Sequence, residues 1–73
     1  MENLDIAKQL STLAILLEIQ GANTFRIRAY QNAVNTVKSL SRPLADMVEA
    51  GEDLTELPDI GKSVAQHIEE LVT

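Results

Sequence analysis

The chain has 73 residues, of which 45% are hydrophobic and 23% are charged, values typical of one small globular domain. It contains no Cys and a single His, which excludes a disulfide framework, a zinc centre and a cysteine nucleophile. The start of the chain is acidic where a secretory signal is basic, and the longest apolar run, residues 13–17, is far short of the roughly 20 residues of a membrane span. We therefore expect a soluble, cytoplasmic monomer without a membrane partner.

The net charge of −5 argues at first sight against a nucleic-acid binder, because neutralising phosphates requires Lys and Arg. The charge is unevenly distributed, however. Residues 1–42 hold five basic and three acidic side chains, whereas residues 43–73 hold one basic side chain, Lys62, and eight acidic ones. A site for an anion must therefore combine the basic residues in the second quarter of the chain with Lys62.

The first predicted helix spans residues 3–20. Asn3 is its candidate N-cap, Asp5 lies in its first turn, and Gly21 can end it. Its apolar stripe follows helical spacing and consists of Ile6, Leu10, Leu13 and Leu17.

The second predicted helix spans residues 24–40, with Asn23 or Thr24 as its cap. Its apolar stripe consists of Phe25, Ala29, Ala33, Val37 and Leu40. Arg26 and Arg28 point about 200° apart around the helix axis, so they cannot share a face. We expect Arg26, near Tyr30, to face a ligand and Arg28 to pair with an acid such as Glu49 or Glu56 or to cap a helix end. Lys38 and Arg42 are interpreted as charges that aid solubility.

Three shorter helices follow. Pro43 suits the first position of a helix over 43–50, with an apolar edge at Leu44, Met47 and Val48, and Gly51 can end that helix in a left-handed conformation. Asp53 can cap a one-turn helix over 53–57, and a final helix over 62–72 carries apolar residues at helical spacing. No segment reads as a strand. The predicted fold class is all-α, with four to five helices in a single domain.

The segment from Leu57 to Ala65 looks like a helix-hairpin-helix motif with its turn at 58–61. A tight turn between two helices aims backbone N–H groups and the positive end of the second helix at a phosphate, and Lys62 adds a cation there. Ile60 is expected to point inward, and Gly61 lets a ligand approach the backbone. Asp59 replaces the first glycine of the usual motif, which places a carboxylate near the expected phosphate. The bland alternative is a turn that only packs two helices.

The run Phe25-Arg26-Ile27-Arg28-Ala29-Tyr30, followed by Ala33, a short third helix and this hairpin, resembles the N-terminal domain of family X DNA polymerases, especially the bacterial and archaeal members. The resemblance covers nearly the whole chain. It implies a four-helix core that binds the 5′-phosphate side of gapped DNA and belongs to a larger repair polymerase. The end at Leu71-Val72-Thr73 has no helix stop signal, which agrees with a domain of a longer chain.

The resemblance also predicts site residues one by one. The lysine that forms a Schiff base in the animal repair enzyme aligns with His67, whose imidazole cannot form an iminium, so the lyase nucleophile is absent. A phosphate-holding lysine aligns with Ser63, a neighbouring glutamate aligns with Gln66, and the pocket tyrosine is retained as Tyr30. The residues expected to contact DNA are Arg26, Tyr30, Ile60, Gly61, Lys62, Ser63 and His67. The resemblance further implies Na⁺ or K⁺ at the main-chain carbonyls of Thr55, Leu57 and Ile60.

Two other functions remain open. The first is deoxyribose-phosphate lyase activity through Lys62, which lies on a different helical face from His67. The second is a helical domain that has lost DNA affinity and packs on its own polymerase or a partner. Clustering of Arg26 with Lys62 distinguishes DNA binding from packing. Tyr30 is also readable as a core aromatic with its hydroxyl at the surface, and His67 as a solvated side chain.

Overall fold

The computed structural model describes residues 1–73 and contains helices without any strand, which confirms the predicted all-α class. The elements are α1 (Asn3–Ile19), α2 (Thr24–Ser39), α3 (Leu44–Glu49), the 3₁₀ turn η1 (Leu54–Glu56) and α4 (Lys62–Val72). Their ends lie within two residues of the predicted ranges. No helix is both long enough and apolar enough to cross a bilayer.

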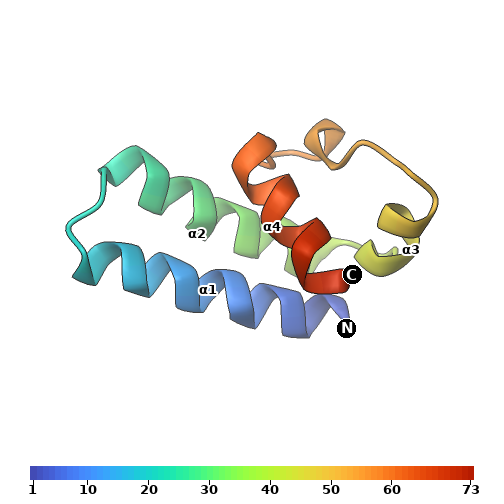
Figure 1. Ribbon diagram of the computed structural model, residues 1–73, viewed down its shortest axis with the longest axis horizontal. Helices are drawn as coiled ribbons and strands as arrows, with labels where there is room; N and C mark the ends of the chain where they lie inside the picture. The colour runs from blue at the N-terminus through green and yellow to red at the C-terminus, as the bar shows by residue number, and fades with distance from the viewer.

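The two long helices, α1 and α2, lie side by side and run antiparallel, and they share the most extensive interface in the molecule (Figure 1). Gly21 has a φ of 72° and ends α1, as predicted. The Asn23 side chain then caps α2 by accepting a hydrogen bond from the Phe25 N–H at 2.7 Å. The core formed by these helices comprises Ile6, Ala7, Leu10, Ala14, Tyr30, Ala33 and Val37.

The predicted apolar stripe of α2 was wrong at its first position. Phe25 is 82% exposed, whereas Tyr30 is 1% exposed and Ala33 and Val37 are fully buried. Tyr30, Ala33 and Val37 follow i, i+3, i+7 spacing, so they define the face that packs against the rest of the molecule. Phe25 lies in the first turn of α2, beyond the reach of that core.

Asn3 does not cap its own helix, which corrects the sequence prediction. Glu2 occupies the N-cap position of α1, without a side-chain hydrogen bond. The Asn3 amide instead reaches the start of α3, where Oδ1 accepts from the Leu44 N–H at 2.8 Å and Nδ2 donates to the Arg42 carbonyl at 2.8 Å. Pro43 is the N-cap of α3 rather than its first residue, and its side chain has no acceptor. A residue from α1 therefore supplies the cap that Pro43 lacks.

The segment between α3 and α4 is held by local polar contacts. The Arg42 guanidinium, which was interpreted as a charge that aids solubility, is exposed and also makes a two-pronged ion pair with the Glu52 carboxylate. The hydrogen bond from Arg42 lowers the pKa of Glu52. Asp53 caps η1 by accepting from the Thr55 hydroxyl at 2.6 Å and the Thr55 N–H at 3.0 Å, and these bonds lower the pKa of Asp53.

The hairpin that precedes α4 is tied to α2 by one buried hydroxyl. Thr36 of α2 is buried and donates its Oγ1 hydrogen to the Pro58 carbonyl at 3.0 Å. Ile60 is only 4% exposed and joins Val64, Ala65 and Ile68 in the core, as expected. The turn of the hairpin is therefore fixed from beneath by apolar packing and by Thr36.

The bridge made by Asn3 generates a stability prediction. Asn3→Ala leaves the Leu44 N–H and the Arg42 carbonyl without their partner, so we expect the free energy of unfolding to fall by about 1–2 kcal/mol. Gln9→Ala, at an exposed position of the same helix, is the control and should change it by less than about 0.5 kcal/mol. Urea unfolding followed by circular dichroism measures both values. Equal effects of the two variants would show that the bridge does not stabilise the fold.

The lowered pKa values of Glu52 and Asp53 predict acid sensitivity. In the folded chain the pKa of each carboxyl lies below its ordinary value, which is 4.5 for Glu52 and 3.8 for Asp53. The cause is the hydrogen bonds that Arg42 donates to Glu52 and Thr55 donates to Asp53. Their stabilisation is therefore present above these values and lost as the pH falls through the lower folded-state pKa values. The stability difference between wild type and Glu52→Gln should be largest above pH 5 and vanish in strong acid. A difference that is constant with pH would contradict this assignment, and exposed Glu56→Gln is the matched control.

Candidate nucleic-acid interface

The start of α2 and the start of α4 enclose a groove that we call the basic groove. Its lining from α2 is Phe25, Arg26, Ala29 and Tyr30, and its lining from α4 is Gly61, Lys62, Ser63 and Val64. Arg26 and Lys62 bring two cations into it, and no carboxylate lines it. The two basic side chains that the sequence placed 36 positions apart thus gather in one groove rather than being scattered.

The floor of the basic groove at α4 offers free backbone donors. Gly61 is the N-cap of α4 and provides no side-chain hydrogen bond. The first N–H groups of a helix, here those of Lys62, Ser63 and Val64, have no acceptor within the helix, and none of the other backbone hydrogen bonds uses them. Together with the positive end of the helix dipole, these donors favour an anion.

Neither the backbone conformation at position 61 nor packing inside the domain requires a glycine there. Its φ of −86° and ψ of −179° are extended values that any residue adopts, and a Cβ at this position would meet no atom within 4 Å. The missing side chain therefore leaves the backbone of the hairpin open on its outer surface.

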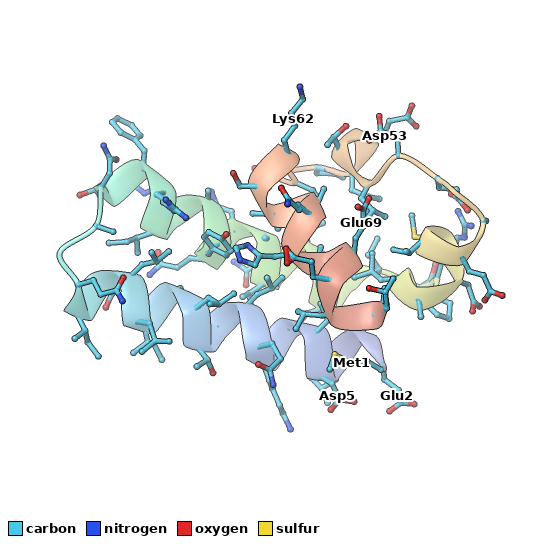
Figure 2. The ribbon with its side chains drawn as sticks, in the orientation of Figure 1. Met1, Glu2, Asp5, Asp53, Lys62 and Glu69 are labelled. Carbon is cyan, nitrogen blue, oxygen red and sulfur yellow. The ribbon has the colours of Figure 1, made fainter.

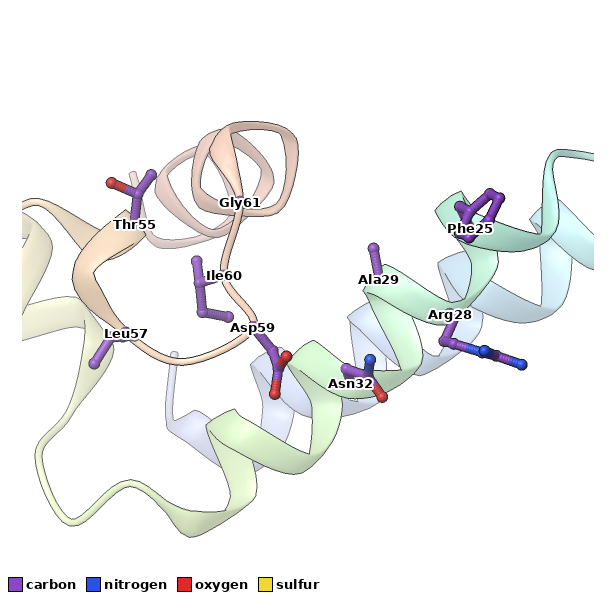
Figure 3. A pocket seen from close by; sticks show the side chains of 9 residues that line it. All are labelled: Phe25, Arg28, Ala29, Asn32, Thr55, Leu57, Asp59, Ile60 and Gly61. Carbon is purple, nitrogen blue, oxygen red and sulfur yellow. The ribbon is translucent and has the colours of Figure 1, made fainter.

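Asp59 adopts the left-handed conformation that the usual glycine would take, with φ at 60°. Its carboxylate does not line the basic groove. It lines a neighbouring groove with Arg28 and Asn32 of α2, and Figure 3 shows the carboxylate turned toward α2 near Asn32. The Asp59 carboxylate, which the sequence placed close to a phosphate, therefore lines the adjoining groove and not the basic groove itself.

Arg28 lies along that neighbouring groove and forms no ion pair, so the predicted pairing with Glu49 or Glu56 was wrong. The only ion pair in the molecule joins Arg42 and Glu52. Arg28 belongs to the N-terminal part of α2, whereas the acidic segment over residues 49–56 lies toward the other end of that helix (Figure 1). Arg28 is exposed and remains free to contact a ligand.

A third groove adjoins the basic groove along α4. It is lined by Arg26, Ser63, Gln66, His67 and Glu70, so Arg26 and Ser63 belong to both. His67 is half-buried rather than a solvated side chain. Its Nδ1 is 2.5 Å from the Tyr30 hydroxyl, and the two rings meet edge to face with centroids 5.5 Å apart.

Two of the predicted contact residues lie in the interior. Tyr30 is 1% exposed, so its ring is a core aromatic and cannot stack on a base. The side chain of Ile60 is buried as well, and the Ile60 N–H donates to the Leu57 carbonyl at 3.3 Å. Both residues therefore support the surface from below, while Arg26, Gly61, Lys62, Ser63 and His67 line its grooves.

Lys62 marks the border between the basic groove and an acidic surface. On the other side of Lys62, a concavity holds Asp53 and Glu69, and Lys62 contributes to the lowered pKa of Asp53 after the hydrogen bonds from Thr55. Figure 2 shows Lys62 projecting from the start of α4, with Asp53 and Glu69 toward η1. The local charge therefore favours an anion on the α2 side of Lys62 and disfavours one on the η1 side.

Phe25 is the surface residue that sequence reasoning missed. It lines both the basic groove, with Arg26, and the groove of Asp59, with Arg28, and its ring is exposed at the start of α2 (Figure 3). An exposed aromatic beside basic side chains is typical of surfaces on which unpaired bases stack. The sequence feature that could have predicted the exposure of Phe25 is its position two residues after the Asn23 cap. A side chain in the first turn of a helix can lie beyond the core against which the rest of the helix packs.

The predicted cation ligands Thr55, Leu57 and Ile60 line one groove together with Asp59. The Leu57 carbonyl already accepts the turn hydrogen bond from Ile60 and retains a second lone pair. The monovalent cation at these carbonyls stays a prediction.

Comparison with known proteins agrees with this geometry. The family model of the helix-hairpin-helix domain matches residues 1–73. The chain is also 31% identical over 72 residues to "DNA polymerase/3'-5' exonuclease PolX" of Bacillus subtilis (strain 168), which covers 99% of this chain and 12% of that protein. No solved structure matches. The similarity to PolX confirms the predicted resemblance to family X DNA polymerases, and the chain belongs to the helix-hairpin-helix domain family.

Proposed function

We propose that this domain binds gapped DNA at the 5′-phosphate side of the gap, through the basic groove. The observation that carries the proposal is the convergence of Arg26, Lys62 and the free amides of residues 62–64 on one groove without a carboxylate. Arg supplies paired donors, Lys supplies a point charge, and the helix start supplies oriented N–H groups. Phosphate oxygens accept hydrogen bonds from all three.

Binding by the isolated domain is expected to be weak. The overall charge of −5 repels DNA at long range, and only the short surface around the basic groove attracts it. We expect a Kd on the order of 10⁻⁴ to 10⁻⁶ M, the range of non-specific DNA binding. Affinity in a cell then depends on other DNA-binding parts of the same protein, which act together through high effective concentration.

The chain spans 12% of the length of PolX, and we propose that it works as one part of a repair DNA polymerase. It would deliver gapped DNA to the polymerising domains during base excision repair in the cytoplasm of a prokaryote.

We also propose Na⁺ or K⁺ at the carbonyls of Thr55, Leu57 and Ile60, where a cation would partly offset the charge of Asp59 beside the turn.

Lyase activity is disfavoured by the arrangement of α4. A Schiff-base mechanism needs an amine beside the bound sugar phosphate, and Lys62 is the only lysine of α4. His67 occupies the position that the resemblance assigns to the nucleophile. Lys62 lines the basic groove but not the groove that contains His67. One observation favours a packing role: α1 exposes the large apolar side chains of Leu4, Ile15, Leu16 and Ile19.

The first test is an NMR titration at low salt with a one-nucleotide gapped duplex that carries or lacks the downstream 5′-phosphate. We expect the amides of residues 61–64 and those around Arg26 to shift when the phosphate is present, and the shifts to fade as salt is added. Lys62→Gln should weaken binding roughly 5- to 10-fold and reduce the salt dependence by about one phosphate contact.

Lys8→Gln is the matched control, because it removes the same charge from the exposed side of α1. Equal losses from Lys62→Gln and Lys8→Gln would mean that only net charge matters and would contradict a defined groove. No shift at millimolar protein would overturn DNA binding and leave packing against a partner as the function.

The second test concerns Asp59. Asp59→Gly removes a negative charge beside the hairpin and relieves the left-handed conformation, so we expect DNA affinity to rise about two- to five-fold as repulsion falls. Stability should change by less than about 1 kcal/mol, because relief of strain is offset by the entropy of glycine. Exposed Asp46→Asn on α3 serves as the charge control. An unchanged affinity for Asp59→Gly would show that this carboxylate lies outside the field felt by DNA.

A further inference from the structure

We infer that the groove of Asp59 binds a guanine base, which stacks on Phe25 and pairs its Watson–Crick edge with the Asp59 carboxylate. The inference goes beyond the proposed function, because it concerns an unpaired base and its identity and not a phosphate. The groove has a volume of about 480 Å³ and contains neither Arg26 nor Lys62, the two cations of the basic groove. Its size lies within the range of pockets that hold small ligands.

The wall that α2 contributes carries three side chains on one face of the helix. Phe25, Arg28 and Asn32 follow one another at helical spacing over two turns, about 10 Å of helix. Figure 3 shows the Phe25 ring and the Arg28 guanidinium on the turns that precede Asn32, and the Asp59 carboxylate near Asn32. The groove therefore has an aromatic end and a polar end.

The Phe25 ring is free to stack on a ligand. Its side chain is 82% exposed, whereas Tyr30, the other aromatic residue, is buried. Every base has a π face, so stacking on an aromatic side chain strengthens the binding of unpaired bases without choosing among them. Any selectivity of this groove must therefore come from its polar end.

The polar side chains of the groove have no partners within the domain. No hydrogen bond or ion pair involves the side chain of Arg28, Asn32 or Asp59, although those of Gln31 and Thr36 on the same helix are bonded. Asp59 is also the one residue other than glycine with a positive φ, at 60°. Backbone strain of this kind is concentrated at functional sites, where it places a side chain for a ligand.

The Asp59 carboxylate selects guanine by the donors of that base. A carboxylate accepts hydrogen bonds and donates none, and its two oxygens accept together from two neighbouring donors. Guanine is the only common base whose Watson–Crick edge presents two neighbouring donors, N1–H and the 2-amino group. Adenine, cytosine and thymine each place an acceptor next to their donor, and that acceptor is repelled by the carboxylate.

Arg28 supplies a second contact to the same base. Arginine donates hydrogen bonds to guanine O6 and N7, the acceptors on the edge that Asp59 does not use. A carboxylate near an aromatic ring would also suit a cation, such as an arginine side chain of a partner protein. Arg28 disfavours that occupant, because it repels a second cation in the same groove. The guanine belongs to an unpaired position of a DNA strand or to a free nucleotide, and the experiment distinguishes these two sources.

The experiment compares bases in one sequence context. Fluorescence anisotropy measures binding of the domain to a labelled oligothymidine strand with one central guanine, and to the same strand with adenine, cytosine or hypoxanthine at that position. Hypoxanthine differs from guanine only by the missing 2-amino group. We expect guanine to bind roughly 5- to 10-fold more tightly than adenine or cytosine, with hypoxanthine in between. NMR titrations with dGMP and dAMP make the same comparison for a free nucleotide.

Two variants test the two ends of the groove. Asp59→Asn keeps a side chain that tolerates the left-handed conformation but replaces one acceptor with a donor, so the preference for guanine over adenine should disappear. This ratio of affinities excludes the general effect of removing a charge, and Asp46→Asn on α3 should leave the ratio unchanged. Phe25→Leu should weaken binding of every strand about 3- to 10-fold, whereas Ile19→Ala, at an equally exposed apolar position of α1, should not.

A preference for guanine in the strand, in the free nucleotide or in both supports the inference and identifies the source. Equal affinities for guanine and adenine in both forms overturn it, and so does a preference that persists in Asp59→Asn. Amide shifts at residues 25–32 and 59 with an arginine amide but not with dGMP would make the groove a docking site for a cationic side chain and would also overturn it.

Failure of the proposed function is a separate result. Lys62→Gln should weaken binding of all strands by the same factor and leave the preference for guanine unchanged, because Lys62 lies outside the groove of Asp59. Gapped DNA that binds equally with and without its 5′-phosphate would contradict the proposed function without affecting the preference for guanine. Two-dimensional amide spectra establish that the variants are folded, and both Phe25 and Asp59 are exposed.

Discussion

The position of α2 between α1 and the hairpin is the constraint on which the rest of the structure depends. One side of α2 buries Ala33 and Val37 against the core shared with α1, and Thr36 holds the Pro58 carbonyl at the hairpin. The first turns of the same helix carry Arg26 to the start of α4. A small domain buries little surface and is only marginally stable, so it gains by using one helix both as core and as one wall of its site.

Local charge, rather than net charge, governs what this surface accepts. The eleven carboxylates are excluded from the basic groove, because Asp59 is turned toward the Arg28 side of the hairpin while Asp53 and Glu69 lie beyond Lys62. Interactions between exposed charges fade over about 10 Å at moderate salt. An acidic domain can therefore carry a short surface that favours an anion, although its net charge is negative.

The pair formed by Tyr30 and His67 illustrates how a position can keep its place and change its chemistry. The resemblance places a Schiff-base lysine at position 67, but an imidazole has no amine with which to form an iminium. Its Nδ1 contacts the hydroxyl of the buried Tyr30, and its ring lines the groove of Arg26 and Ser63.

The sequence by itself determined the helices and the hairpin, because their signals are local. Helical spacing, the Asn23 cap, Gly21, Gly51 and the Leu57-Pro58 break act within a few residues, and the observed elements follow them closely. The inward orientation of Ile60 was likewise predictable from the motif.

Only the tertiary structure decided which groups meet across the fold. The Asn3 bridge to α3, the exposure of Phe25, the pairing of Arg42 with Glu52 and the contact of Tyr30 with His67 join residues far apart in the sequence or depend on what covers a helix end. The spacing of apolar residues shows which side of a helix is apolar, but it does not show how far along that side the neighbouring helices extend. A side chain such as Asn3 therefore had a local interpretation that a distant partner overruled.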